Sequence, residues 1–138
     1  NFNSPIGAWD VSNVEHMMSM FEYCENFNMP IGAWNVQNVK NMTSMFFEAQ
    51  SFNQPVGDWN VGNVELMHFM FNKAISFNQS LENWKPLKLN KTVGMFWGAT
   101  SFQYHQFVPS QAKEDRYGDD TEEETDIKKL ILKVFLGD

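Results

Sequence analysis

The amino-acid sequence predicts an α/β fold: a leucine-rich-repeat-like solenoid in which each 25-residue coil has one short parallel strand and one short helix. Three series of residues, each with a constant step of 25, predict it: Trp at 9, 34, 59 and 84, Met-Phe at 20–21, 45–46, 70–71 and 95–96, and Phe at 2, 27, 52, 77 and 102. A fixed period indicates stacked structural repeats. This one lies within the roughly 20–29 residues of leucine-rich-repeat coils and is short for a helical pair.

The first expected element of each coil is a strand, at residues 9–12 of the first coil. Trp9 and Val11 alternate there with Asp10 and Ser12. Alternation of apolar and polar residues is typical of a strand with one buried face. Trp9 and Val11 are therefore expected to face the core, and Asp10 and Ser12 the solvent.

The second expected element is a short helix over residues 14–24. Its apolar residues recur at intervals of three and four: Val14, Met17, Met20, Phe21 and Cys24. This spacing places them on one face of a helix. Asn13, or Ser12 before it, is suited to cap the amino-terminal end.

The segment 3–7 is expected to form the turn that leads into each strand. Asn3-Ser4-Pro5-Ile6-Gly7 has counterparts at 28–32 and 53–57, with Pro and Gly in the same places. Pro fixes one backbone angle, and Gly after it permits a positive φ. This turn would redirect the chain for the next coil.

Stacking is expected because a single coil cannot bury its own apolar face. Strands stack about 4.8 Å apart and helices about 8–10 Å apart, so the stack should curve with its strands on the concave side. Asn13, Asn38 and Asn63 recur once per coil and are expected to form an internal ladder that bonds backbone groups of the neighbouring coil. A row of Asn and Asp holding Ca²⁺ is disfavoured, because Ca²⁺ prefers several convergent carboxylates.

The chain divides into three expected parts: a solenoid of four repeats and a partial fifth at 1–108, an acidic linker at 109–126, and an amphipathic helix at 127–138. Pro86 falls inside the fourth expected strand, which makes that unit the expected carboxy-terminal cap. The first repeat begins on the consensus at Phe2, so further repeats or another cap are expected upstream. Residues 127–136 are expected either to dock on the open end of the solenoid or to bind a partner. Their few basic residues argue against a membrane surface.

Composition and motifs argue against several classes of function. A net charge of −7 disfavours nucleic acid, and no apolar run reaches the roughly 18 residues of a membrane span. His16, His68 and His105 have no metal-ligand spacing, and Cys24 stands where other coils have Ala, which favours an inert core thiol. Motifs for phosphate binding, zinc proteases and serine hydrolases are missing from the sequence. The sequence therefore predicts no enzyme activity, no cofactor and no metal site.

The repeat resembles that of BspA-like leucine-rich-repeat surface proteins, which also occurs in mycoplasma surface lipoproteins. The resemblance rests on Trp-Asp-Val-Ser-Asn-Val at 9–14, Met-x-x-Met-Phe at 17–21 and Phe-Asn-x-Pro-Ile-Gly at 27–32, and it covers about residues 2–108. It implies a leucine-rich-repeat-like solenoid located at a cell surface, secreted or on a virion, with a role in adhesion or assembly. It supplies no catalytic residue.

The favoured hypothesis is a non-enzymatic module that binds a protein or glycan at a surface. Its expected concave face carries small polar side chains at the outward strand positions: Asp10, Ser12, Asn35, Gln37, Asn60 and Lys85. A solvated face without a ligand is the plainer interpretation of the same residues. The second hypothesis is a structural subunit of a larger assembly, such as a viral particle or a cell-surface layer, joined through repeat edges or the segment 127–136.

Overall fold

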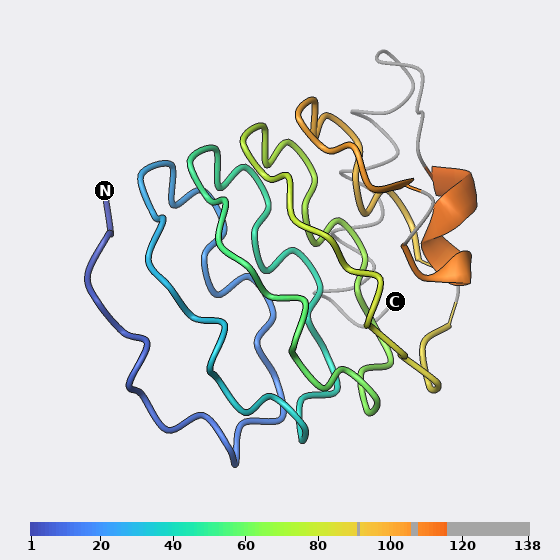
Figure 1. Ribbon diagram of the computed structural model, residues 1–138, viewed down its shortest axis with the longest axis horizontal. Coiled ribbons are helices and arrows are strands. Elements are labelled where there is room, and N and C mark those ends of the chain that lie inside the picture. Colours follow the sequence, from blue (N-terminus) through green and yellow to red (C-terminus); the bar gives the residue numbers. More distant parts are fainter. Residues whose placement is uncertain (91, 106–107, 116–138) are drawn as a thin grey trace, which may run out of the picture.

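The structure, a computed structural model, describes residues 1–90, 92–105 and 108–115. Successive 25-residue units, 2–26, 27–51, 52–76 and 77–101, form coils that lie side by side (Figure 1). The predicted strand and helix in each coil are wrong, because the described residues contain neither an α-helix nor a strand. Their one regular element is the 3-10 helix η2, Ser110–Asp115. Isolated parallel bridges pair His16 with Asn41 and Asn41 with Leu66.

The expected helix fails because alternate amides of that segment point to the next coil. The amides of Met17, Ser19, Phe21 and Tyr23 donate over 2.8–2.9 Å to the carbonyls of Asn41, Thr43, Met45 and Phe47. The amides between them donate within the coil, as in Met20 to Met17 and Glu22 to Ser19. The second coil repeats this pattern against the third, from Met42 to Leu66 through Glu48 to Asn72. The backbone is thus satisfied without the i to i−4 bonds of a helix.

This alternation needs left-handed backbone conformations at two positions per coil. In the first three coils, these positions are occupied by residues with φ between 55° and 59°: Ser19, Tyr23, Ser44, Glu48, Phe69 and Lys73. Gly94 and Gly98 take the same positions in the fourth coil. A positive φ at a residue with a side chain costs about 1–2 kcal/mol, so the bonds between coils must offset it repeatedly.

The expected strand is replaced by three consecutive turns. The amide of Trp9 donates to Ile6, and the amide of Val14 donates to Val11. Between them the amide of Ser12 donates to the side-chain carboxylate of Asp10 at 3.0 Å. These amides are therefore used within the coil and cannot form a ladder with a neighbouring strand.

Aromatic rings 25 residues apart do lie one above another. Phe27, Phe52, Phe77 and Phe102 form one column, with ring centroids 5.7–6.0 Å apart and nearly parallel planes. A second column contains Phe21, Phe46, Phe71 and Phe96, with centroids 5.4–5.6 Å apart. The two columns have similar spacing, and without helices and strands the reason for expecting a curved stack with a concave strand face disappears.

The Trp column is buried in three coils and exposed in the first. Trp34, Trp59 and Trp84 are buried, and each indole Nε1 donates to a carbonyl of the preceding coil, those of Ile6, Ile31 and Val56. Trp9 was also expected to face the core, but 54% of its surface is exposed. The first coil, to which Trp9 belongs, is the coil at one edge of the stack (Figure 1).

Two Asn ladders join the coils. The predicted hydrogen bonds of the first ladder are present, because Asn38 Nδ2 donates to the Ser12 carbonyl at 2.7 Å and Asn63 Nδ2 to that of Gln37 at 2.6 Å. The ladder is not internal as expected, because Asn38 is exposed and Asn63 is only partly buried. A second ladder was not predicted. The side-chain oxygens of Asn3, Asn28, Asn53 and Asn78 each accept the backbone amide 25 residues later. Each ladder satisfies polar groups that the turns leave unpaired.

The recurring Gly is needed for close packing and not for a positive φ as expected. Gly7, Gly32 and Gly57 all have ordinary negative or extended φ values. A Cβ at Gly32 would lie 2.5 Å from the carbonyl oxygen of Pro55 in the next coil. The backbones of adjacent coils therefore approach each other at this corner.

The far side of the fourth coil is covered by the chain that follows it. Pro86 lies in a turn and not in a strand, with its carbonyl accepting the Leu89 amide. Val108 and Ala112 are buried in the core, and Gln111 Nε2 donates to the Leu89 carbonyl at 3.1 Å. Residues 110–115 of the expected linker thus form η2 at the end of the stack (Figure 1). The predicted helix at 127–138 lies outside the described residues.

Candidate functional site

The residues predicted to form a binding face lie in rows along the stack, but several of them hold turns. The side-chain oxygens of Asp10, Asn35 and Asn60 each accept the backbone amide two residues later. The Asp10 carboxylate also accepts the Ser12 hydroxyl at 2.6 Å, and these hydrogen bonds lower the pKa of Asp10. Asp10, Asn35 and Asn60 therefore have a structural reason to recur, whatever else they contact.

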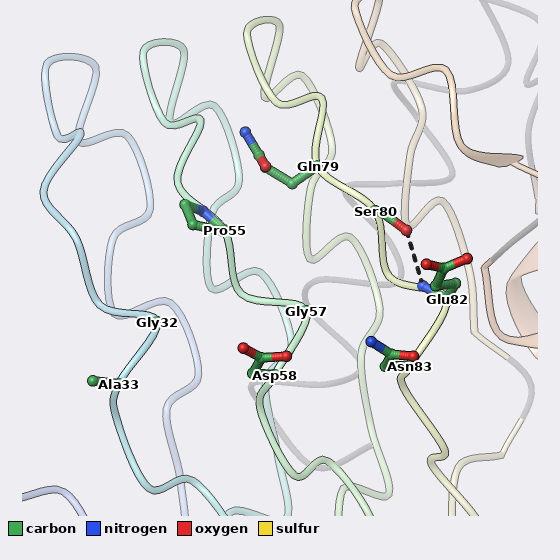
Figure 2. Close-up of a pocket in the computed structure, with 9 residues that line it drawn as sticks. All are labelled: Gly32, Ala33, Pro55, Gly57, Asp58, Gln79, Ser80, Glu82 and Asn83. Atoms are coloured by element: carbon green, nitrogen blue, oxygen red, sulfur yellow. Dashed lines mark hydrogen bonds between the residues drawn. The ribbon is translucent and has the colours of Figure 1, made fainter.

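A groove crosses the second, third and fourth coils beside this row (Figure 2). It encloses about 540 Å³ and is lined by Gly32, Ala33, Pro55, Gly57, Asp58, Gln79, Ser80, Glu82 and Asn83. Its hollow shape follows from the small residues at the corner, because Gly32 and Gly57 cannot carry a Cβ there. A side chain at either position would collide with a carbonyl of the next coil.

Two side chains of the groove are already engaged in the fold. Gln79 Nε2 donates to the carbonyl and side-chain oxygens of Asn53. Ser80 Oγ accepts the amide of Glu82 at 3.3 Å (Figure 2). The side chains of Asp58, Glu82 and Asn83 take no part in the turns or ladders described above. They present two carboxylates and one amide to a ligand.

A smaller groove of about 430 Å³ continues the first one. It shares Gly57, Asp58 and Asn83 with it and adds Trp59, Asn60, Val61 and Lys85. Two predicted site residues, Asn60 and Lys85, therefore line the combined surface. Asp10, Ser12, Asn35 and Gln37 do not line either groove.

Asp58, Glu82 and Asn83 were missed because they interrupt the repeat. Asp58 and Asn83 stand where the first two coils have Ala8 and Ala33, and Glu82 stands where other coils have Gly. The carbonyl 23 residues after Glu82, that of His105, accepts the Val108 amide. The sequence did distinguish these three residues, because each of them departs from the repeat at an exposed position.

A third hollow of about 500 Å³ lies beside η2. It is lined by Glu82, Trp84, Lys85, Pro86, Leu87, Val108, Pro109, Ser110 and Gln111. Leu87 is 89% exposed, which is unusual even for a surface Leu. It contributes an apolar side chain to an otherwise mixed surface.

The remaining chemically distinctive groups are dispersed. Burial raises the pKa of the half-buried Cys24 thiol, which keeps it protonated and less reactive. His68 Nδ1 accepts the Val93 amide at 3.0 Å, and burial lowers the pKa of His68. Within the described part of the chain, no three His, Cys, Asp or Glu residues are grouped to hold a metal ion. The same residues include no helix that could cross a membrane.

Comparison with known protein families gives a match over most of the chain. A family model described as "Mycoplasma protein of unknown function, DUF285" matches residues 1–108. No curated protein and no solved structure matches. The match agrees with the resemblance to mycoplasma repeats and does not confirm a BspA-like leucine-rich repeat.

Proposed function

The chain belongs to the DUF285 family of mycoplasma proteins, and we propose that it is a non-enzymatic interaction module whose groove binds a protein or glycan at a surface. The observation that carries the proposal is the position of Asp58, Glu82 and Asn83. They are exposed, they line one continuous groove, and they replace the small residues that the fold uses elsewhere. Side chains that the fold does not require are free to serve recognition.

The chemistry of the groove favours a ligand with many hydrogen-bonding groups. Carboxylates accept hydrogen bonds, and the Asn83 amide both donates and accepts them. Hydroxyls of a glycan or the backbone of an extended peptide supply the matching groups. The groove is open along the stack, which suits a chain-like ligand that spans coils two to four.

The proposal is tested by screening the purified protein on an oligosaccharide array and on immobilised cell-surface proteins. The double variant Asp58→Ala/Asn83→Ala is then compared with wild type on each hit. We expect binding weakened by about tenfold or more, as for removal of central contact residues. Asp10→Asn is the matched control, because Asn holds the same turn in the next two coils. Equal affinity of the double variant and wild type for every hit would refute the groove assignment.

A structural subunit of a larger assembly is the second candidate. The exposure of Trp9 and of Phe2, at 54% and 38%, along one edge of the stack favours it. Light scattering separates the two functions. A ligand-binding module is expected to be a single species that binds its ligand reversibly, whereas an assembly subunit forms larger particles as concentration rises.

A further inference from the structure

A small apolar cluster lies apart from the main core. Phe47 and Phe69 form its centre, and Val93 and Trp97 pack against them. The Tyr23 ring meets the Phe47 ring edge-on, with centroids 5.5 Å apart. These five side chains, which we call the outer strip, extend from the first coil to the fourth.

The repeat does not require apolar side chains in the outer strip. The counterparts of Phe47 in the first and third coils are Glu22 and Asn72, and Tyr23 is replaced by Glu48 in the second. Part of the strip is accessible, because Tyr23 is 58% exposed and Val93 and Trp97 are only partly buried. Accessible apolar side chains that neither the core nor the repeat needs indicate contact with another segment or molecule.

Two polar atoms at the strip have an unused capacity for hydrogen bonds. Trp97 Nε1 and Asn72 Oδ1 are both buried, and neither bonds to a described residue. Asn72 and Trp97 occupy the same position in successive coils, so one acceptor and one donor are neighbours there. Buried polar groups are normally paired, and a peptide backbone that covers the strip supplies both kinds of partner.

Carboxylates border the strip where it begins. Glu22 precedes Tyr23 in the chain, and Glu48 follows Phe47. Burial and then the nearby Glu48 carboxylate raise the pKa of Glu22, so the two acids lie close together. Lys73 Nζ pairs with Glu48 at 3.5 Å, whereas Glu22 forms no ion pair with a described residue. The surface is therefore complementary to an apolar segment that carries positive charge.

We infer that residues 127–136 of the same chain dock on the outer strip. This segment, Ile-Lys-Lys-Leu-Ile-Leu-Lys-Val-Phe-Leu, combines seven apolar residues with three Lys and contains no acid. Its apolar residues match the strip and its lysines match Glu22 and Glu48. The exposed Leu87 is a poorer site, because Lys85 and Lys88 beside it repel the lysines of the segment. The inference goes beyond the binding groove and does not depend on it.

The connection is long enough for this contact. The described chain ends with η2 at Asp115, and an extended chain from there to Ile127 spans roughly 40 Å. Rings of adjacent coils are 5.4–5.6 Å apart, so the first and fourth coils are separated by only roughly 17 Å. The segment can therefore reach every part of the strip.

The test follows hydrogen–deuterium exchange of the full chain by mass spectrometry. In wild type, the amides of residues 127–136 should exchange at least about tenfold more slowly than in a free peptide of the same sequence. Tyr23→Ser/Trp97→Ser removes the two accessible aromatic rings of the strip and should abolish this protection. Peptides that contain Phe46 and Phe71, whose amides donate to the next coil, report whether the stack remains intact.

The matched control, Ile75→Ser/Leu87→Ser, removes two exposed apolar side chains outside the strip and should leave the protection unchanged. A second variant leaves the coils unaltered. Lys128→Glu/Lys129→Glu/Lys133→Glu places acids against Glu22 and Glu48 and should speed exchange of the segment by about tenfold. This variant decides the matter if Tyr23→Ser/Trp97→Ser also loses protection at Phe46 and Phe71.

The inference is supported if both the strip variant and the charge reversal release the segment. It is overturned if residues 127–136 exchange freely in wild type, or if only the control variant releases them. Protection that disappears on dilution of the protein also overturns it, because the segment would then bind a second copy of the chain.

Discussion

Ser44 illustrates at the residue scale what the fold demands of its sequence. Its φ is 56°, its side chain is fully buried, and its hydroxyl has no hydrogen-bond partner among the described residues. Gly94 occupies the same position in the fourth coil. We expect Ser44→Gly to raise the free energy of unfolding by about 1 kcal/mol, because it removes both the backbone penalty and the unsatisfied hydroxyl.

Urea unfolding of Ser44→Gly against wild type checks this prediction. Ser51→Gly is a suitable control, because Ser51 is exposed and does not have a positive φ. It should lower the free energy of unfolding by about 0.5–1 kcal/mol, as Gly does at ordinary positions. If both variants are destabilised equally, the left-handed conformation at residue 44 is contradicted.

His68 gives the molecule a pH dependence of known sign. Burial lowers its pKa in the folded protein, and its Nδ1 can accept the Val93 amide only when it is unprotonated. The unfolded chain therefore binds the proton more readily, so the free energy of unfolding falls as pH drops below the ordinary His value of about 6.5. Above that pH, His68 is neutral in both states and its contribution is constant.

His68→Thr tests this assignment, because Thr43 occupies the same position in the second coil. Urea unfolding is measured for both proteins at intervals from about pH 5 to about pH 8. Toward acidic pH, the free energy of unfolding of wild type should fall relative to that of the variant, which lacks the titrating side chain at this position. A difference that stays constant over this range would show that His68 titrates identically in the folded and unfolded states.

At the scale of the element, the indole bonds between coils should contribute measurable stability. Trp59→Phe keeps an aromatic ring but removes the bond from Nε1 to the Ile31 carbonyl, 3.0 Å long, and leaves a small void. We expect the free energy of unfolding to fall by about 1–3 kcal/mol. The Ile31 carbonyl still accepts the Trp34 amide, which keeps the loss moderate.

Trp9→Phe is the matched control for this change. It makes the same substitution in the same register, but Trp9 lies at the exposed edge. Its free energy of unfolding should differ from wild type by less than about 0.5 kcal/mol, as for most surface substitutions. Thermal melts of the two variants at equal concentration give the comparison, and equal losses would contradict the role of the indole bond.

The elements themselves were harder to predict than the columns. Identical residues at a step of 25, such as Phe27 and Phe52, indicated which side chains stack, because a repeat stack brings equivalent positions together. The spacing of Met17 and Phe21 fits a helix, yet it also fits a chain of tight turns that buries the same two residues. Periodicity reports which side chains face the core and leaves the backbone hydrogen bonds unspecified.

One feature of the sequence, the two Gly residues of the fourth coil, indicated the positions with a positive φ. The residues at the same positions in the other coils obscured it. Gly94 and Gly98 appear only in the fourth coil, while Ser19 and Tyr23 in the first carry side chains that rarely adopt a positive φ.

The groove was missed for a related reason. Asp58 and Glu82 become meaningful only once the structure shows that the corner around them is hollow.

At the scale of the whole molecule, each coil depends on its neighbours for both hydrogen bonds and burial. A residue such as Thr43 accepts an amide from the first coil, and the next residue, Ser44, donates to the third. Stability in such a stack is approximately a sum of coil terms and interface terms. The equivalence of the coils then predicts that one can be removed without loss of the fold.

Deletion of residues 52–76 tests this equivalence. The new junction, Ser51 to Phe77, reproduces the natural sequence Ser76-Phe77, so the Phe columns can re-form with one member fewer. We expect a cooperative urea transition with a lower midpoint. The slope of the free energy of unfolding against urea concentration should decrease by about a fifth to a quarter, because that slope follows the surface exposed on unfolding.

Deletion of residues 52–63 removes half a coil and places Val64 where the next Phe belongs. The stack beyond the junction should then be lost, and with it the cooperative transition, because the carbonyls that face the second coil no longer stand opposite its four amides. If the half-coil deletion unfolds with the same midpoint as the whole-coil deletion, the 25-residue register is not what holds the coils together.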